Sequence, residues 1–131
     1  MKILLVEDSD AMRGVVREML RRLDYGEVVE ASDGEEAWFQ LCQEPFDLLL
    51  TDWNMPNMSG LELVEMVRQK PEFSDLPVVM LTTRNNKQDI VSAIKAGIDN
   101  YITKPCKPSQ LKSKIDKAMR HAAQRRSKSK S

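Results

Sequence analysis

The sequence predicts an α/β fold in which a parallel five-stranded sheet lies between two layers of helices. Three observations predict it. Short apolar runs alternate five times with stretches of helical periodicity, the links between them are short, and the run of leucines within residues 46–51 lacks alternation. Strand–helix alternation with short links favours parallel strands and right-handed crossovers. A strand without alternation is typical of one that is buried on both faces.

Each strand is predicted from a short apolar run that ends at polar or turn-forming residues. The first run, Ile3 to Val6, is entirely aliphatic, and the third is rich in leucine. The second and fifth runs contain fewer apolar residues. In chain order the predicted strands cover residues 3–6, 27–30, 46–51, 76–81 and 99–103.

Each helix is predicted from apolar positions on one face and from capping residues at its ends. Ser9 or Asp10 is the expected N-cap of the first helix, and Asp33 to Glu36 resembles a capping box at the start of the second. Gly97 fits the left-handed position that often follows a helix. The predicted helices cover residues 11–23, 33–42, 61–69, 87–96 and a last stretch from residue 108.

The 131 residues are enough for one domain, which we expect to cover residues 1–122. The remaining segment, 123–131, is rich in Arg, Lys and Ser and offers nothing to bury, so we expect it to be a disordered basic tail. No apolar run approaches the roughly 20 residues of a membrane span. The start of the chain lacks the pattern of a signal peptide. We therefore expect a cytoplasmic protein in which Cys42 and Cys106 are free thiols.

Charge is unevenly spread along a chain whose net charge is zero. Residues 1–75 hold 17 acidic and 7 basic side chains, whereas residues 76–131 hold 3 acidic and 13 basic ones. Such asymmetry predicts a local site for cations and a separate face for anions.

Polar side chains follow four of the five predicted strands. Five strand–helix units predict a flavodoxin-like three-layer sandwich with the strand order 2-1-3-4-5, whose ligands bind beyond the carboxyl ends of the first and third strands. The polar residues at these ends are Glu7, Asp8, Asp52, Thr82, Thr83 and Lys104. Two like charges about 4 Å apart repel by on the order of 4 kcal/mol at an effective dielectric constant near 20. A divalent cation would remove this cost, and carboxylate, carbonyl and water oxygens suit Mg²⁺, with Mn²⁺ as an alternative.

Four segments resemble the receiver domains of bacterial two-component response regulators. They are VEDS at 6–9, LTDWNMPNMSG at 50–60, MLT at 80–82 and YITKP at 101–105. The stretch after Asp52 is especially similar to CheY-like chemotaxis regulators. The resemblance covers residues 1 to about 119 and is far more specific than any single Asp or Lys.

This resemblance implies a role for each residue of the predicted site. Asp52 matches the phosphoacceptor, which takes a phosphoryl group from a sensor histidine kinase. Glu7, Asp8, Asp52 and the main-chain carbonyl of Asn54 match the ligands of Mg²⁺. Such a chain is a phosphoacceptor in signal transduction, not an enzyme acting on a separate substrate.

The resemblance also implies how the phosphoryl group is reported. Thr82 and Lys104 match the residues that contact the phosphoryl group, with Thr83 beside them, and Tyr101 matches an aromatic residue that turns inward. The peptide bond between Lys104 and Pro105 is expected to be cis. Tyr101, Lys114 and Lys117 match an output face for an acidic partner such as a flagellar motor switch, with no membrane or nucleic acid involved.

Three other readings remain open. A phosphorelay or phosphate-sink receiver shares every site residue with the output switch. A Mg²⁺-dependent phosphatase of the haloacid-dehalogenase type would use Asp8-Ser9-Asp10, although Met12 does not fit that motif and Asp52 would have no role. An FMN-binding flavodoxin would need a Ser/Thr–Gly phosphate loop, where this chain has Glu7 and Asp8.

Overall fold

The computed structural model describes residues 1–130, and it contains the predicted five-stranded parallel sheet. The strand order is β2-β1-β3-β4-β5, with every neighbouring pair parallel. In chain order the elements are β1 (Lys2–Val6), α1 (Asp10–Arg22), β2 (Glu27–Ala31), α2 (Gly34–Gln43), β3 (Leu48–Thr51), α3 (Gly60–Gln69), the 3₁₀ helix η1 (Pro71–Phe73), β4 (Val78–Thr82), α4 (Lys87–Ala96), β5 (Asn100–Thr103) and α5 (Pro108–Lys130). The predicted α/β sandwich of the flavodoxin type is therefore confirmed.

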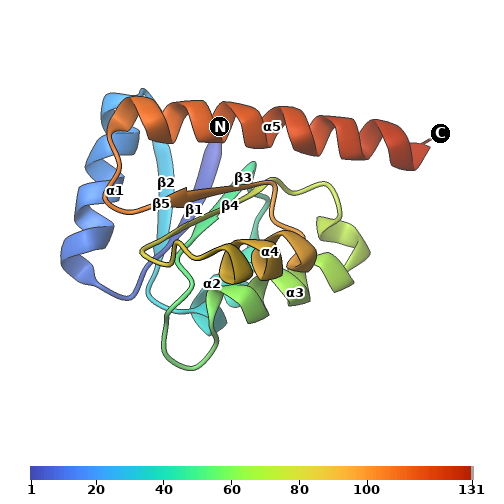
Figure 1. The fold of residues 1–131 in the computed structure, drawn as a ribbon, viewed down its shortest axis with the longest axis horizontal. Helices are drawn as coiled ribbons and strands as arrows, with labels where there is room; N and C mark the ends of the chain where they lie inside the picture. Colours follow the sequence, from blue (N-terminus) through green and yellow to red (C-terminus); the bar gives the residue numbers. More distant parts are fainter. Residues whose placement is uncertain (131) are drawn as a thin grey trace.

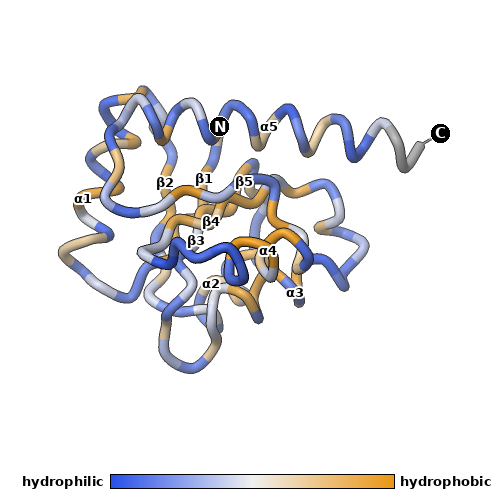
Figure 2. Tube along the Cα trace, in the orientation of Figure 1, coloured by the Kyte–Doolittle hydropathy of each residue, from blue (hydrophilic) through white to orange (hydrophobic). Residues whose placement is uncertain are grey.

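Helices cover both faces of the sheet (Figure 1). Helices α1 and α5 pack on one face, around a cluster that includes Val16, Leu20, Leu111 and Ile115. Helices α2, α3 and α4 cover the other face around a second cluster that includes Leu63. Figure 2 shows the strands as mostly hydrophobic segments and helix α5 as largely hydrophilic. Two apolar layers of this kind hold the carboxyl ends of the strands in fixed positions.

Two local features differ from the sequence prediction around β4. The strand begins at Val78 and not at Leu76, because the Leu76 N–H donates to the carbonyl of Phe73 in a turn. Pro77 has no N–H to donate to a neighbouring strand. The 3₁₀ helix η1 just before this turn was not predicted, and it brings Phe73 against the second cluster.

Helix α5 continues beyond the predicted domain boundary at residue 122 and runs to Lys130. The structure describes residues 123–130 as part of this helix, whereas the sequence favours a disordered tail there, and Ser131 lies outside the described residues. Ala122 is buried, and the Arg125 guanidinium donates to Asp99 and to the carbonyl of Ser74, at 3.2 Å for the latter. These contacts hold the turns of α5 that follow residue 122 against the rest of the molecule. None of the described helices is long and apolar enough to cross a membrane.

Candidate functional site

The carboxyl edge of the sheet positions the predicted site residues through main-chain hydrogen bonds just beyond the strands. The Asp52 N–H donates to the carbonyl of Val6 at 3.0 Å, and the Lys104 N–H donates to that of Thr82 at 2.9 Å. The Glu7 N–H likewise donates to the carbonyl of Ala31 at 3.0 Å. These bonds extend the ladders by one residue and bring side chains from three strand ends together.

Three carboxylates gather at this edge. Glu7, Asp8 and Asp52 each offer one oxygen, and these oxygens lie within 4.8 Å of one another. Glu7 is buried, Asp52 is half-buried and Asp8 is exposed to solvent. The sequence prediction of an acidic cluster is therefore confirmed in its geometry.

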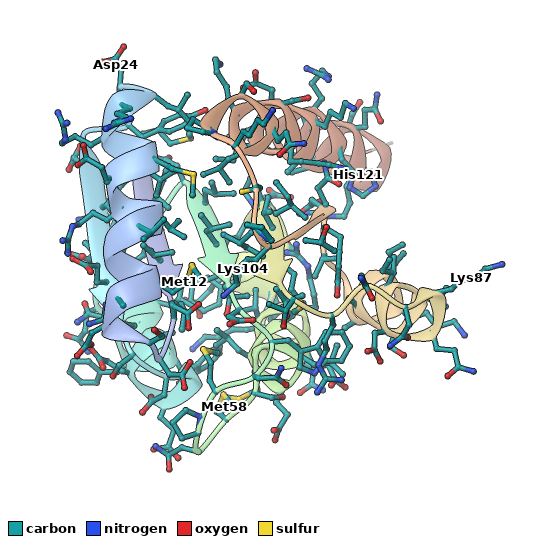
Figure 3. All side chains as sticks on the ribbon, turned by 60° about the vertical axis from the view of Figure 1, so that its left-hand side comes forward. Met12, Asp24, Met58, Lys87, Lys104 and His121 are labelled. Atoms are coloured by element: carbon teal, nitrogen blue, oxygen red, sulfur yellow. The ribbon has the colours of Figure 1, made fainter. Side chains whose placement is uncertain are left out.

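The Lys104 ammonium is the positive group inside the cluster. It donates to Glu7 and to Asp52 Oδ2, at 2.9 Å for the latter, and its side chain is 8% exposed. Figure 3 shows Lys104 in the interior of the molecule. Burial alone would lower the pKa of Lys104, but the hydrogen bonds to the two carboxylates outweigh it and raise the pKa. Lys104 therefore stays charged.

One ammonium does not balance three carboxylates. Burial raises the pKa of Glu7 above its ordinary value, the hydrogen bond from Lys104 opposes this, and the neighbouring Asp8 and Asp52 raise the pKa further. The remaining negative charge lies on the open side, where Asp8 faces solvent. A three-carboxylate set with an open side suits a hard divalent cation that keeps part of its water shell.

The loop after Asp52 fixes the direction of its carboxylate. The Trp53 N–H donates to Asp52 Oδ1 at 2.6 Å, which leaves Oδ2 facing Lys104. The Gly60 N–H, at the start of α3, donates to the carbonyl of Trp53 at 2.8 Å. A Cβ atom at Gly60 would lie 1.9 Å from the Asp52 carbonyl oxygen, so only glycine permits this approach.

The predicted switch residues lie on the next two strands. Thr82 is buried at the end of β4, whereas the neighbouring Thr83 is exposed. Tyr101 on β5 is 8% exposed and its hydroxyl donates to the carbonyl of Arg84 at 2.6 Å. The Lys104–Pro105 peptide bond is cis.

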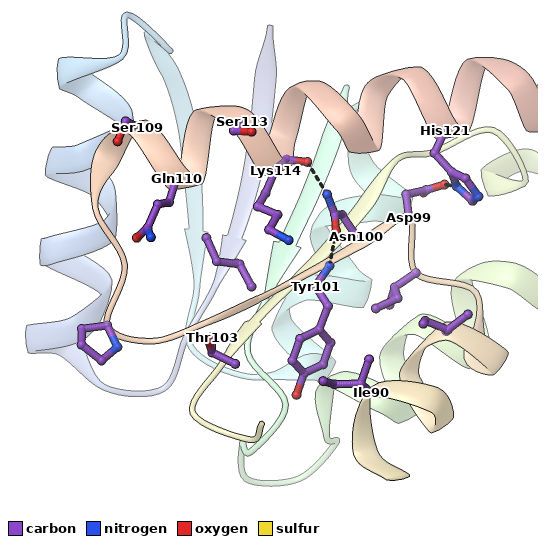
Figure 4. Close-up of a pocket in the computed structure, with 14 residues that line it drawn as sticks. Ile90, Asp99, Asn100, Tyr101, Thr103, Ser109, Gln110, Ser113, Lys114 and His121 are labelled. Atoms are coloured by element: carbon purple, nitrogen blue, oxygen red, sulfur yellow. Dashed lines mark hydrogen bonds and ion pairs between the residues drawn. The ribbon is translucent and has the colours of Figure 1, made fainter. Parts of the chain in front are cut away.

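A groove of about 760 Å³ runs between α4, β5 and α5 (Figure 4). Tyr101 and Lys114 line it, whereas Lys117 lies outside its lining. On its α4 side Ile94 is 58% exposed. The groove coincides with part of the predicted output face.

Two long-range contacts were not predicted from the sequence. Trp53 is 7% exposed, and the Arg84 guanidinium covers its ring at 4.4 Å from the centroid. His121 is a surface side chain, and its Nδ1 lies 2.7 Å from an oxygen of the buried Asp99. No local motif reveals these contacts, because each joins residues more than 20 positions apart.

Asp10 does not join the acidic cluster. Its side chain is 90% exposed and pairs with Arg13 at 2.6 Å on the outside of α1. The Asp-x-Asp arrangement of a haloacid-dehalogenase phosphatase needs both acids in one site. The geometry therefore favours Asp52 as the central acid.

Comparisons with known proteins agree with this geometry. The family model for the response regulator receiver domain matches residues 3–116. A chemotaxis protein CheY homolog of Campylobacter jejuni is 46% identical over 117 residues, which cover 88% of this chain and 90% of that protein. The solved structure of the chemotaxis protein CheY4 of Vibrio cholerae has a TM-score of 0.81 at 33% identity, covering 89% of this chain and 97% of that one.

A second solved structure is the receiver domain of a sensor histidine kinase from Pseudomonas aeruginosa, with a magnesium ion coordinated in its active-site cleft. It has a TM-score of 0.81 at 28% identity and covers 90% of this chain and 96% of that one. Sequence, fold and the arrangement of acids and lysine at the sheet edge lead to the same conclusion. The chain belongs to the response regulator receiver domain family.

Proposed function

We propose that the chain is a phosphoacceptor in two-component signalling, phosphorylated on Asp52 by a sensor histidine kinase. One observation carries the proposal: the Asp52 carboxylate, fixed by the Trp53 N–H, points one oxygen at the buried Lys104 ammonium in an acidic cluster. An aspartate held in this way is oriented for attack. The chain is then a carrier of the phosphoryl group and assists its own phosphorylation.

The transfer needs orientation and charge neutralisation more than covalent machinery. A carboxylate oxygen of Asp52 forms the bond to phosphorus while the bond between phosphorus and the donor histidine nitrogen breaks. The products are an aspartyl phosphate and a histidine that regains its neutral ring. Lys104 neutralises charge on one side of the phosphoryl group, and the Thr82 hydroxyl, buried at the end of β4, donates to a phosphoryl oxygen. The neighbouring Thr83 is exposed, and we propose that it borders the same opening.

Glu7, Asp8, Asp52 and the main-chain carbonyl of Asn54 would hold Mg²⁺, or Mn²⁺ with the same oxygen donors. The fit rests on the three carboxylate oxygens within 4.8 Å of one another and on the open side at Asp8. The magnesium ion in the cleft of the Pseudomonas aeruginosa relative supports it. A cation held by these residues would supply positive charge that neutralises the phosphoryl oxygens.

We propose that the phosphoryl group acts on the face formed by α4, β5 and α5. Thr82 and Tyr101 lie on neighbouring strands, so a shift of the threonine reaches the tyrosine that lines the groove. Lys114 within the groove and Lys117 nearby supply positive charge for an acidic partner. The names of the CheY relatives support a role in chemotaxis, with a flagellar motor switch as the partner and the cytoplasm as the location.

A phosphorelay or phosphate-sink receiver is the second candidate. This candidate is supported by the likeness to the receiver domain of a sensor histidine kinase, which has the same TM-score as CheY4. The two roles separate in one comparison. An output switch binds a motor-switch peptide more tightly after addition of beryllofluoride and Mg²⁺, whereas a relay receiver loses its phosphoryl group to a histidine phosphotransfer protein.

The central test is incubation with acetyl phosphate and Mg²⁺ followed by intact mass measurement. We expect one added phosphoryl group, which is absent in Asp52→Asn and absent when the metal is chelated. Asp116→Asn is the matched control, because Asp116 lies on the surface of α5 in a pair with Lys112. Phosphorylation of the Asp52→Asn protein would contradict the assignment.

A further inference from the structure

Arg84 lies just past the end of β4, and its side chain reaches across to the loop that follows the phosphoacceptor. Its guanidinium covers the Trp53 ring at 4.4 Å from the centroid. Nε and Nη2 both donate to Asn54 Oδ1, at 3.2 and 2.7 Å, and Nη1 lies 3.4 Å from Asp89 Oδ2 on α4. The planar group is therefore held on its face and on two edges.

The main chain of Arg84 contacts both proposed switch residues. Its N–H lies 3.4 Å from Thr82 Oγ1, and its carbonyl accepts the hydrogen bond of the Tyr101 hydroxyl at 2.6 Å. A threonine hydroxyl that accepts one bond still has its proton to donate. The contact thus holds residues 82–84 together and still leaves the Thr82 hydroxyl able to donate to a phosphoryl group.

The side-chain and main-chain contacts act on one short segment. The side chain anchors residues 82–84 to Trp53 and Asn54, and the carbonyl of the same residue fixes the phenol of Tyr101. If the anchor is released, the carbonyl moves with the loop and the hydroxyl loses its acceptor. A buried hydroxyl without a partner is unfavourable, so the ring would turn outward to water.

We propose that Arg84 is a positioning residue that holds residues 82–84 against the phosphoacceptor loop and so keeps Tyr101 inward before any phosphoryl group arrives. This regulatory role rests on the proposed function, in which Tyr101 belongs to the output face. The unphosphorylated chain then already has the tyrosine in its inward position. Phosphorylation then acts on an output face in which Arg84 already favours the inward position of Tyr101.

The test follows Tyr101 directly by ¹⁹F NMR of protein labelled with 3-fluorotyrosine. The chain has two tyrosines, so Tyr25 serves as an internal reference, and a Tyr25→Phe variant assigns the signals. Spectra are recorded in H₂O and in D₂O, without Mg²⁺ and without a phosphoryl donor. The size of the solvent isotope shift reports how far each ring is exposed.

We expect a small isotope shift for Tyr101 in the unsubstituted chain and a shift larger by about twofold in Arg84→Ala, as the outward population grows. Tyr25, which packs beside α1 and α5, should not change, and this shows that the variant is folded. Arg84→Lys should give an intermediate shift, because lysine keeps the charge beside Asp89 but cannot bind Asn54 with two N–H groups while lying flat on Trp53. Arg21→Ala is the matched control, since Arg21 pairs with Glu18 on the surface of α1, on another element than Arg84.

An exposed Tyr101 in the unsubstituted chain, or an unchanged isotope shift in Arg84→Ala, would overturn the proposal. Full restoration by Arg84→Lys would also overturn it, because charge alone would then hold the loop. The measurement needs no metal and no phosphoryl transfer. A failure here is therefore distinct from a failure of Asp52 to accept a phosphoryl group, which the mass measurement detects.

Discussion

At the scale of single residues, Gly60 shows how closely the backbone is packed behind the phosphoacceptor. A Cβ atom at this position would lie 1.9 Å from the Asp52 carbonyl oxygen. We expect Gly60→Ala to displace the loop and to slow phosphorylation by acetyl phosphate by on the order of 100-fold, because a misplacement of about 1 Å is enough for such a loss. The rate of mass gain measures it.

Gly26 provides the matched control for this substitution. A Cβ atom there meets nothing within 4 Å, so Gly26→Ala should leave the phosphorylation rate unchanged. If Gly60→Ala reacted as fast as Gly26→Ala, the close approach of α3 would have no part in orienting Asp52.

The two tyrosines give a pH dependence with a definite sign. Burial raises the pKa of Tyr101 and of Tyr25 above the ordinary value of about 10. The unfolded chain therefore loses its phenolic protons first as the pH rises, and the folded state is stabilised less above pH about 10 than below it. We expect phenolate absorbance to appear at higher pH in the folded protein than in urea. Coincident titration curves would contradict the burial of both rings.

The residues of the candidate site could be predicted because each follows a strand. Glu7, Asp52 and Lys104 take their places from the parallel sheet alone, which brings the carboxyl ends of strands to one edge. Arg84 could not be predicted in the same way. Its contact with Asn54 joins residues 30 positions apart and depends on the reach of one side chain across two loops.

At the scale of elements, the end of α5 is held by contacts that a pattern of basic residues does not reveal. Arg125 donates to Asp99 and to the carbonyls of Ser74 and Leu76, at 3.2 and 3.4 Å for the carbonyls. Truncation after Ala122 removes them. We expect it to lower the free energy of unfolding by about 2 kcal/mol, in line with hydrogen bonds to a charged group. Urea denaturation measures the change.

A chain truncated later in α5 separates the loss of the Arg125 hydrogen bonds from a general effect of helix length. A chain that ends at Ser127 keeps Arg125 and should retain nearly all of the stability, while Arg125→Ala in the full chain should lose as much as the cut at residue 122. Equal stability of the chains ending at residues 122 and 127 would show that the added turns do not dock.

The same element explains where prediction from sequence fails. The apolar spacing at Leu111, Ile115 and Ala118 predicts a helix, and all three are buried. Past Ala122 the sequence has no large apolar residue, so the basic composition favoured disorder. The helix continues because the carboxylate of Asp99, with no exposed side-chain surface, accepts hydrogen bonds from this region.

At the scale of the whole molecule, we expect the fold not to depend on a metal ion. The Lys104 ammonium already offsets part of the charge of Glu7 and Asp52. We expect the chain to stay folded in a chelator and to gain about 2.7 kcal/mol at a Mg²⁺ concentration 100 times the dissociation constant. This corresponds to a rise in melting temperature on the order of 10 °C.

Asp8→Asn tests whether that gain comes from the acidic cluster, because Asp8 is its exposed member. The variant should lose most of the Mg²⁺-dependent rise while unfolding normally in the chelator. NaCl at the same ionic strength controls for screening. An undiminished rise in the variant would place the cation elsewhere.

Asp99 ties the amino-terminal end of the sheet to its neighbours, among them Val78, Arg68 and Arg125. Its carboxylate accepts from the Val78 N–H at 2.9 Å and from Arg68 at 3.0 Å, besides Arg125, and burial lowers the pKa of Arg68 to about 10. Helix α4, in contrast, buries only Ala93 fully. The contacts of Asp99 thus fix one end of the sheet, whereas α4 is held by few buried side chains. We expect a phosphoryl group on Asp52 to displace α4 more readily than the end of the sheet that Asp99 holds.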